Sequence, residues 1–72
     1  MTKGTAESAI GAMIGALSDL LERALAETRE AITYIEGGNR NAAIGTIADL
    51  DQVLADALAL QGAARAVHRQ AR

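Results

Sequence analysis

Two runs of apolar residues recur at helical spacing along the chain, separated by one polar, glycine-containing break. In the first run, from about residue 5 to 36, apolar residues recur every three or four positions: Ile10, Met13, Ile14, Leu17, Leu20, Leu21, Ala24, Leu25, Ile32 and Ile35. The second run follows the same rule through Ala43, Ile47, Leu50, Val53, Leu54, Ala57, Leu58, Leu60, Gln61 and Ala64. This spacing is typical of amphipathic α-helices and predicts helices over about 5–36 and 42–68.

The break at 37–41 carries the residues that end one helix and begin another. Gly37 or Gly38 suits the left-handed conformation of a helix C-cap, and Asn39 or Asn41 suits an N-cap. A connection this short makes the two helices antiparallel neighbours. The sequence therefore predicts one all-α domain over residues 1–72, an antiparallel helical hairpin with a frayed basic C-terminus.

The apolar stripes are wider than a single contact between two helices needs. Met13 and Leu20 flank the first stripe, and Val53 and Leu60 flank the second. The chain has 72 residues, no cysteine and a single aromatic residue, Tyr34. A core of this size rarely supplies more than about 3–5 kcal/mol. We therefore expect the hairpin to form a homodimer, as a four-helix bundle.

Charge and residue chemistry argue against several classes of function. The net charge of -2 is unlike that of a dedicated nucleic-acid binder. His68 is the one histidine, and the chain lacks the Glu-x-x-His pair of di-metal bundles and the Gly-Lys-Ser/Thr element of phosphate-binding loops. We expect no enzymatic activity, no cofactor and no metal. The lack of cysteine fits a cytoplasmic protein, and the excess of arginine over lysine fits a bacterial or phage origin.

The segment SAIGAMIGAL, residues 8–17, is the most apolar part of the chain. Nine uninterrupted apolar residues are far fewer than the roughly 20 that span a membrane. Glu7 and the lack of a small-residue cleavage site argue against an export signal. Gly11 and Gly15 lie at the edge of the stripe, where small residues let another backbone approach closely. Two interpretations stay open: a helix end packed on Ala63, Ala64 and Val67, or a docking site.

Antiparallel pairing places this segment beside the basic C-terminal residues. The resulting candidates for partner binding are Ile10, Met13, Ile14, Leu17, Arg65, Arg69 and Arg72, with Tyr34 as a separate candidate near the turn. We interpret the chain as a non-enzymatic protein-interaction module, such as an adaptor, chaperone-like protein or inhibitor. It would act as a homodimer on a protein partner that the sequence does not identify.

Two alternative functions use parts of the same surface. In architecture, a dimer of hairpins resembles the Rop-type plasmid regulators, and this resemblance implies RNA binding through Arg65, Arg69 and Arg72. The other alternative is an amphipathic helix that lies on a membrane surface through SAIGAMIGALSDLL. Such helices are usually rich in basic residues on their polar face, whereas this one carries Asp19 and Glu22.

Overall fold

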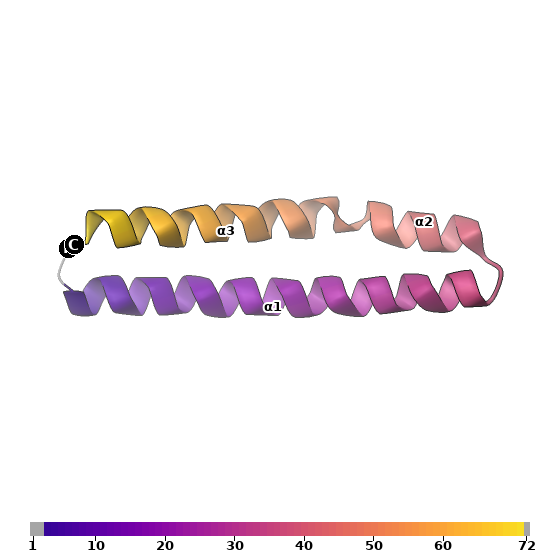
Figure 1. The fold of residues 1–72 in the computed structure, drawn as a ribbon, viewed down its shortest axis with the longest axis horizontal. Coiled ribbons are helices and arrows are strands. Elements are labelled where there is room, and N and C mark those ends of the chain that lie inside the picture. Colours follow the sequence, from indigo (N-terminus) through magenta and orange to yellow (C-terminus); the bar gives the residue numbers. More distant parts are fainter. Residues whose placement is uncertain (1–2, 72) are drawn as a thin grey trace.

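The fold is an antiparallel pair of helical rods joined by one tight turn (Figure 1). In the computed structural model, which describes residues 3–71, the helices are α1 (Lys3–Glu36), α2 (Arg40–Ala48) and α3 (Leu50–Gln70). Helices α2 and α3 follow one another along a single line and together pack against α1. The described residues contain no strand. The predicted all-α class is therefore confirmed, and the two rods form a hairpin.

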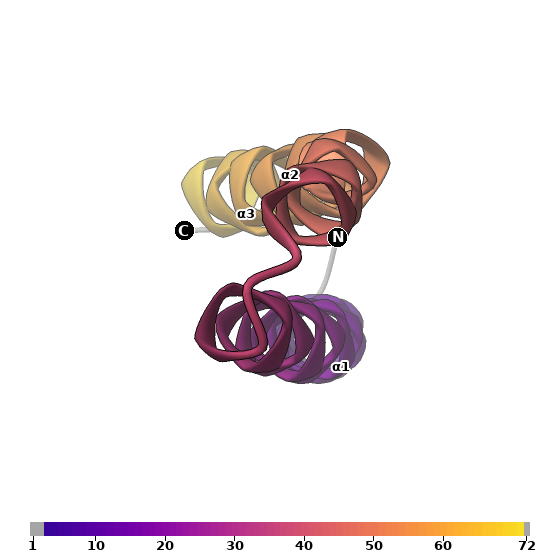
Figure 2. The same cartoon turned by 90° about the vertical axis from the view of Figure 1, so that its right-hand side faces the viewer.

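The hairpin is long and only one layer thick. Its Cα atoms extend over 54 × 14 × 11 Å, and the end-on view shows one rod on either side with no third element between or beside them (Figure 2). Every buried side chain of the described residues is therefore covered by the rod opposite or by its own helix. The polypeptide ends near Lys3 and Gln70 lie together, far from the turn (Figure 1).

A single line of side chains from each rod makes the contact, and we call these two lines the seam. Its members are buried or half-buried and alternate in steps of three and four residues. On α1 they are Ala6, Ile10, Met13, Leu17, Leu20, Ala24, Glu27, Ala31 and Tyr34. On the other rod they are Ala43, Thr46, Leu50, Val53, Ala57, Leu60, Ala64 and Val67. This 3.5-residue repeat is the seam of a coiled coil.

The turn is held by a Schellman motif at the end of α1. The amide of Asn39 donates to the Tyr34 carbonyl over 2.8 Å, and that of Gly38 donates to the Ile35 carbonyl over 3.0 Å. Gly38 adopts a positive φ of 79°, the left-handed conformation that a side chain disfavours. The Asn39 side chain then accepts a hydrogen bond from the amide of Ala42 over 3.1 Å and so caps α2.

The second rod is divided where the sequence predicts one helix over 42–68. It begins at Arg40, is interrupted at Asp49 and continues to Gln70. The segment before Asp49 is a weak helix former, with Gly45 and the β-branched Ile44, Thr46 and Ile47 in α2. The Thr46 hydroxyl also donates to the carbonyl of Ala42 over 2.9 Å, a bond that tends to bend helices. The seam nevertheless keeps its repeat across Asp49.

We expect Gly38→Ala to lower the free energy of unfolding by about 1–2 kcal/mol, because alanine disfavours the left-handed conformation. Gly37→Ala is the matched control. A Cβ there would meet the Thr33 carbonyl oxygen at 3.5 Å, which is ordinary contact, and φ at Gly37 is not positive. Chemical denaturation of both variants at equal protein concentration makes the comparison. Equal losses for the two glycines would contradict this role of Gly38.

Candidate interaction surface

A continuous apolar surface lies along one side of the hairpin, and we call it the open face. Among the described residues, nine large apolar side chains are between 48% and 68% exposed, with Ile47 the least and Leu58 the most exposed. They are Ile14, Leu21, Leu25, Ile32 and Ile35 of α1, Ile44 and Ile47 of α2, and Leu54 and Leu58 of α3. By contrast, the buried core of the described residues contains only alanines, Leu50 and Val53.

All nine residues lie on the same side because each directly follows a seam residue. Leu21 follows Leu20, for example, and Leu54 follows Val53. One residue turns an α-helix by about 100°. In two antiparallel helices that face each other, the residue after a seam residue therefore lies on the same side of the pair in both helices. The nine residues therefore form two adjacent apolar stripes, one on each rod. Both stripes are turned by about 100° from the seam around the axis of their own rod.

Shallow hollows on the open face confirm that the two stripes adjoin. Leu17 and Leu21 of α1 line one hollow together with Ala57, Leu58 and Gln61 of α3. Nearer the turn, another hollow is lined by Thr28, Ala31, Ile32 and Ile35 of α1 and Ile47 of α2. A third runs along α1 between Ile14 and Leu25. Most residues that line these hollows are aliphatic, and the polar ones are Ser18, Glu22, Thr28 and Gln61.

Charged and polar side chains gather on the reverse side, at positions that directly precede seam residues. They are Asp19, Arg23, Glu30, Asp49, Gln52 and Asp56. Several are joined along their own helix: Arg23 Nε lies 3.2 Å from Glu27 Oε1, and Gln52 Nε2 donates to Asp56 Oδ1 over 2.7 Å. Among the residues that directly follow a seam residue, the formal charges are Asp51, near the middle, and Glu7 and Arg65, near the end where the chain termini lie. Glu22 also lines the hollow between Ile14 and Leu25.

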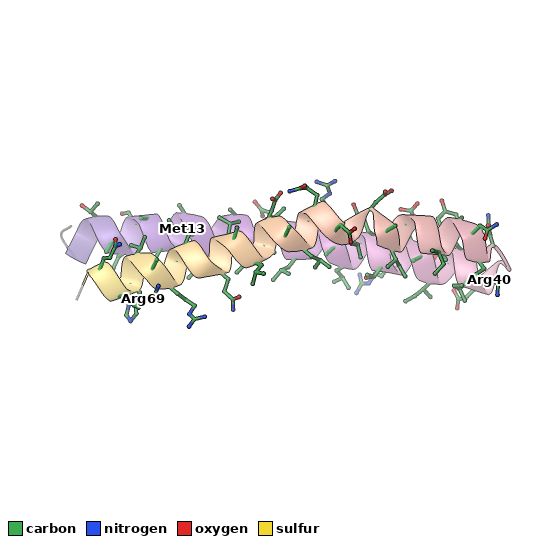
Figure 3. All side chains as sticks on the ribbon, turned by 90° about the horizontal axis from the view of Figure 1, so that it is seen from above. Met13, Arg40 and Arg69 are labelled. Carbon is green, nitrogen blue, oxygen red and sulfur yellow. The ribbon has the colours of Figure 1, made fainter. Side chains whose placement is uncertain are left out.

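The candidate residues of the apolar segment divide between the seam and the open face. Ile10, Met13 and Leu17 are half-buried in the seam, whereas Ile14 is 56% exposed. Figure 3 places Met13 on α1 near the end of the hairpin that carries Arg69. Ile14 is therefore the one member of this group that lies mainly on the free surface.

The basic candidates gather at the open end of the hairpin. Arg65 and Arg69 are exposed and line a hollow with Ile10, Ala64 and His68. Antiparallel pairing thus brings Ile10 beside the arginines. Arg72, the remaining basic candidate, lies outside the described residues.

Gly11 and Gly15 point away from the second rod. A Cβ built on either glycine meets no atom within 4 Å. Ala63 is exposed, and Ala64 and Val67 are half-buried against other residues of the seam. No residue of the described chain therefore packs closely on these two glycines, and Gly11, which follows Ile10, lies at the end of the open face.

The apolar residues that the contact between the rods leaves exposed are not the ones that the sequence pattern predicts. Val53 is only 2% exposed and Met13, Leu20 and Leu60 are half-buried, so all four belong to the seam and do not flank it. The exposed residues are their neighbours one position further along the chain. A strict 3.5-residue repeat that includes alanines is the signal that distinguishes the seam from the open face.

Tyr34 is half-buried at the turn end of the seam and is engaged by its own helix. Its hydroxyl donates to Glu30 Oε1 over 3.0 Å. This hydrogen bond and the negative charge of Glu30 raise the pKa of Tyr34 above its ordinary value of 10.0, with a further contribution from desolvation. The tyrosine thus supports the end of α1 and points to the polar side, away from the open face.

Two further findings concern residues 3–71, the part of the chain that the structure describes. No three His, Cys, Asp or Glu side chains within residues 3–71 come together in a way that holds a metal ion. None of the helices combines the length and apolar character that crossing a membrane requires.

Comparison with known proteins returns no relative. No family model matches the chain, and neither the curated proteins nor the solved structures include a significant match.

We expect the phenolate absorbance of Tyr34, the sole aromatic residue, to appear at higher pH in the folded chain than in the denatured chain. Because the unfolded chain releases this proton first, stability should fall as the pH rises through 10.0. Glu30→Gln should lower the pKa of Tyr34, whereas Glu22→Gln, elsewhere on α1, should leave it unchanged. An identical titration of Glu30→Gln and the parent chain would contradict the hydrogen bond.

Proposed function

We propose that this chain is a non-enzymatic protein-interaction module that works as a homodimer, with the open face as its principal binding surface. The observation that carries the proposal is the set of nine exposed Leu and Ile side chains on one side of a two-helix hairpin. Monomeric soluble proteins rarely expose so continuous an apolar surface, and such surfaces mark interaction sites.

The free energy available on this surface is large relative to the hairpin's own core. Covering a half-exposed Leu or Ile contributes about 1 kcal/mol, and nine such side chains are available in each copy. Six of the residues that the structure describes are buried, and four of them are alanines. Association through the open face would therefore stabilise the fold as well as bind a partner.

The angle between the seam and the open face suits a four-helix bundle. In such a bundle each helix contacts two neighbours, at roughly a right angle around its axis. Here the seam supplies one contact, and the open face, turned by about 100° from it, supplies the other. A second hairpin placed face to face would thus complete a bundle of four helices.

The basic end provides a second, smaller surface for a further partner. Arg65, His68 and Arg69 surround an apolar hollow that reaches Ile10. Side chains of this kind suit an acidic peptide segment with an aliphatic residue in the hollow. An adaptor or inhibitor built in this way would dimerise through the open face and contact its target at the rim.

We expect the chain to sediment at twice its 7.4 kDa monomer mass at micromolar concentration. Leu25→Gln combined with Leu58→Gln should convert the dimer to a monomer, because both changes place polar amides in the interface. The matched control is Ala16→Gln combined with Ala63→Gln. These exposed residues directly precede seam residues, so they lie on the reverse side.

Circular dichroism of both double variants, measured at the same concentrations, separates loss of association from loss of helix. A parent chain that sediments at the monomer mass over the whole concentration range would contradict the proposal. The same conclusion would follow if both double variants dissociated equally.

A further inference from the structure

Aliphatic residues of the open face stand at matching levels on the two rods. Leu21 shares a hollow with Leu58, and Ile32 shares another with Ile47. Because the rods are antiparallel, equal steps in opposite directions along the chain lead from one pair to the next. The aliphatic pairs found in this way are Leu21/Leu58, Leu25/Leu54, Ile32/Ile47 and Ile35/Ile44.

Polar residues of the open face also share levels. Thr28 and Asp51 stand at the level between the isoleucine pairs and the leucine pairs. Ser18 and Gln61 stand at the next level toward the open end, and Gln61 lines the same hollow as Leu58. Counted from the turn, both rods therefore present two isoleucines, one polar residue, two leucines and a second polar residue.

Two placements of a second hairpin bring open face against open face with the rods aligned and twofold symmetry. If both turns lie at the same end, the axis runs along the hairpins, and α1 packs against the partner's α2–α3 rod. If the turns lie at opposite ends, the axis runs across the helices, and each rod packs against its own copy. In the first placement the register is fixed, because rotation about a lengthwise axis leaves every residue at its own level.

From the matching levels we infer that the second copy binds with its turn at the same end, about a twofold axis parallel to the rods. This inference rests on the proposed function, which requires a second copy on the open face. Each open-face residue then meets the residue of its own level on the partner's other rod. Leu25 lies level with the partner's Leu54, for example, and Ile35 lies level with the partner's Ile44.

The two faces are self-complementary in this placement. Leucine meets leucine, isoleucine meets isoleucine, and Thr28 meets the partner's Asp51. Each of the four aliphatic pairs is formed twice, once on either side of the axis. Ile14, at the next level beyond Ser18, lies against the aliphatic stem of the partner's Arg65. The open face is therefore covered along its entire length.

Turns at opposite ends use the same surface less completely. An axis at the level of Leu25 would place Leu21 beside the partner's Thr28 and Ile32 beside the partner's Ser18. Aliphatic side chains would then cover polar ones at two levels of α1. Such contacts leave polar groups without water or a hydrogen-bond partner, which opposes association.

An axis at the level of Thr28 and Asp51 restores aliphatic pairs but shortens the contact. It would place Leu21 level with the partner's Ile35, so that the residues of α1 before Ser18 extend beyond the partner's turn. Ile14 would stay uncovered. Asp51 would also face the partner's Asp51, and two like charges in an aliphatic surrounding repel each other. Only turns at the same end combine matched levels with full overlap.

The same-end placement brings basic residues of both copies to one end of the bundle. Arg65 and Arg69 line the hollow at that end. Glu7 directly follows the seam residue Ala6 and lies at the same end, where it offsets part of this charge. All three charged side chains are exposed, so water and salt screen the remaining repulsion. Exposed charges of this kind weaken association less than mismatched aliphatic levels do.

Mixtures of single-cysteine variants test the arrangement directly, because the chain contains no cysteine of its own. We expect an equimolar mixture of Leu25→Cys and Leu54→Cys to form a mixed, disulfide-linked dimer on mild oxidation. A mixture of Leu21→Cys and Ile35→Cys should form none, since 14 residues of helix separate their levels by about 21 Å. Labelling one variant of each mixture with ¹⁵N lets mass spectrometry distinguish mixed from self-linked dimers.

Ala16→Cys mixed with Ala63→Cys is the matched control. These exposed residues share a level in the same way as Leu25 and Leu54, but they directly precede seam residues and so lie on the reverse side. No mixed dimer should form. Equal cross-linking of the control mixture and of the Leu25→Cys and Leu54→Cys mixture would contradict the inference.

The outcomes distinguish this inference from the proposed function. A mixed dimer of Leu21→Cys with Ile35→Cys, and none of Leu25→Cys with Leu54→Cys, would place the turns at opposite ends. It would overturn the inference and leave the homodimer intact. Mixed dimers in both mixtures, or in neither while the reduced proteins sediment at the dimer mass, would also overturn the arrangement alone. A monomer mass for the reduced parent chain would overturn both.

We expect Ser18→Leu combined with Gln61→Leu to lower the dimer dissociation constant by at least about tenfold, because a further aliphatic level would then be covered. Ala16→Leu combined with Ala63→Leu, on the reverse side, should leave the constant unchanged. Sedimentation equilibrium measures both. A constant equal to that of the parent chain would overturn the inference, since Ser18 would then lie at the partner's turn or outside the contact.

Discussion

The seam between the two rods is the contact on which the rest of this structure depends. It is built largely from alanines and from aliphatic residues at a 3.5-residue repeat, so the rods lie side by side over their whole length. Two helices can cover only one side of each other. Because larger aliphatic residues stand one position beyond the seam, the same contact that forms the hairpin also leaves Leu and Ile side chains uncovered on one surface.

The distribution of charged side chains also distinguishes the two sides of the hairpin. Asp19, Arg23, Glu30, Asp49, Gln52 and Asp56 directly precede seam residues, whereas all nine exposed Leu and Ile side chains directly follow one. The reverse side therefore carries more formal charge than the open face, and the large exposed aliphatic side chains lie on the open face. Arg65 and Arg69 lie at the open end of the hairpin, whereas Glu36 and Arg40 flank the turn at the other end.

The helical hairpin and its turn are predictable from the sequence because they follow from local chemistry. Apolar spacing identifies both rods, and Gly38 and Asn39 identify the cap of one helix and the start of the next. The interacting side of each rod is harder to predict. Leu20 and Leu21, or Val53 and Leu54, are adjacent aliphatic residues of similar size, and composition does not indicate which of them faces the other rod. Alanines such as Ala24, Ala31 and Ala57 decide it, because they allow the close approach that larger residues prevent.

The spacing of apolar residues does not predict the interruption at Asp49 either, because that spacing continues unbroken across it. The interruption arises from the weak helix propensity of a few residues. It leaves α2 as a segment of nine residues. Helices this short do not persist without tertiary contacts, yet α2 carries Ile44 and Ile47 of the open face. Amide hydrogens of α2 should consequently exchange with solvent by local opening well before those of α1 and α3. Any molecule that covers the open face would suppress this local opening. The rate of amide hydrogen exchange in α2 would therefore report whether the open face is occupied.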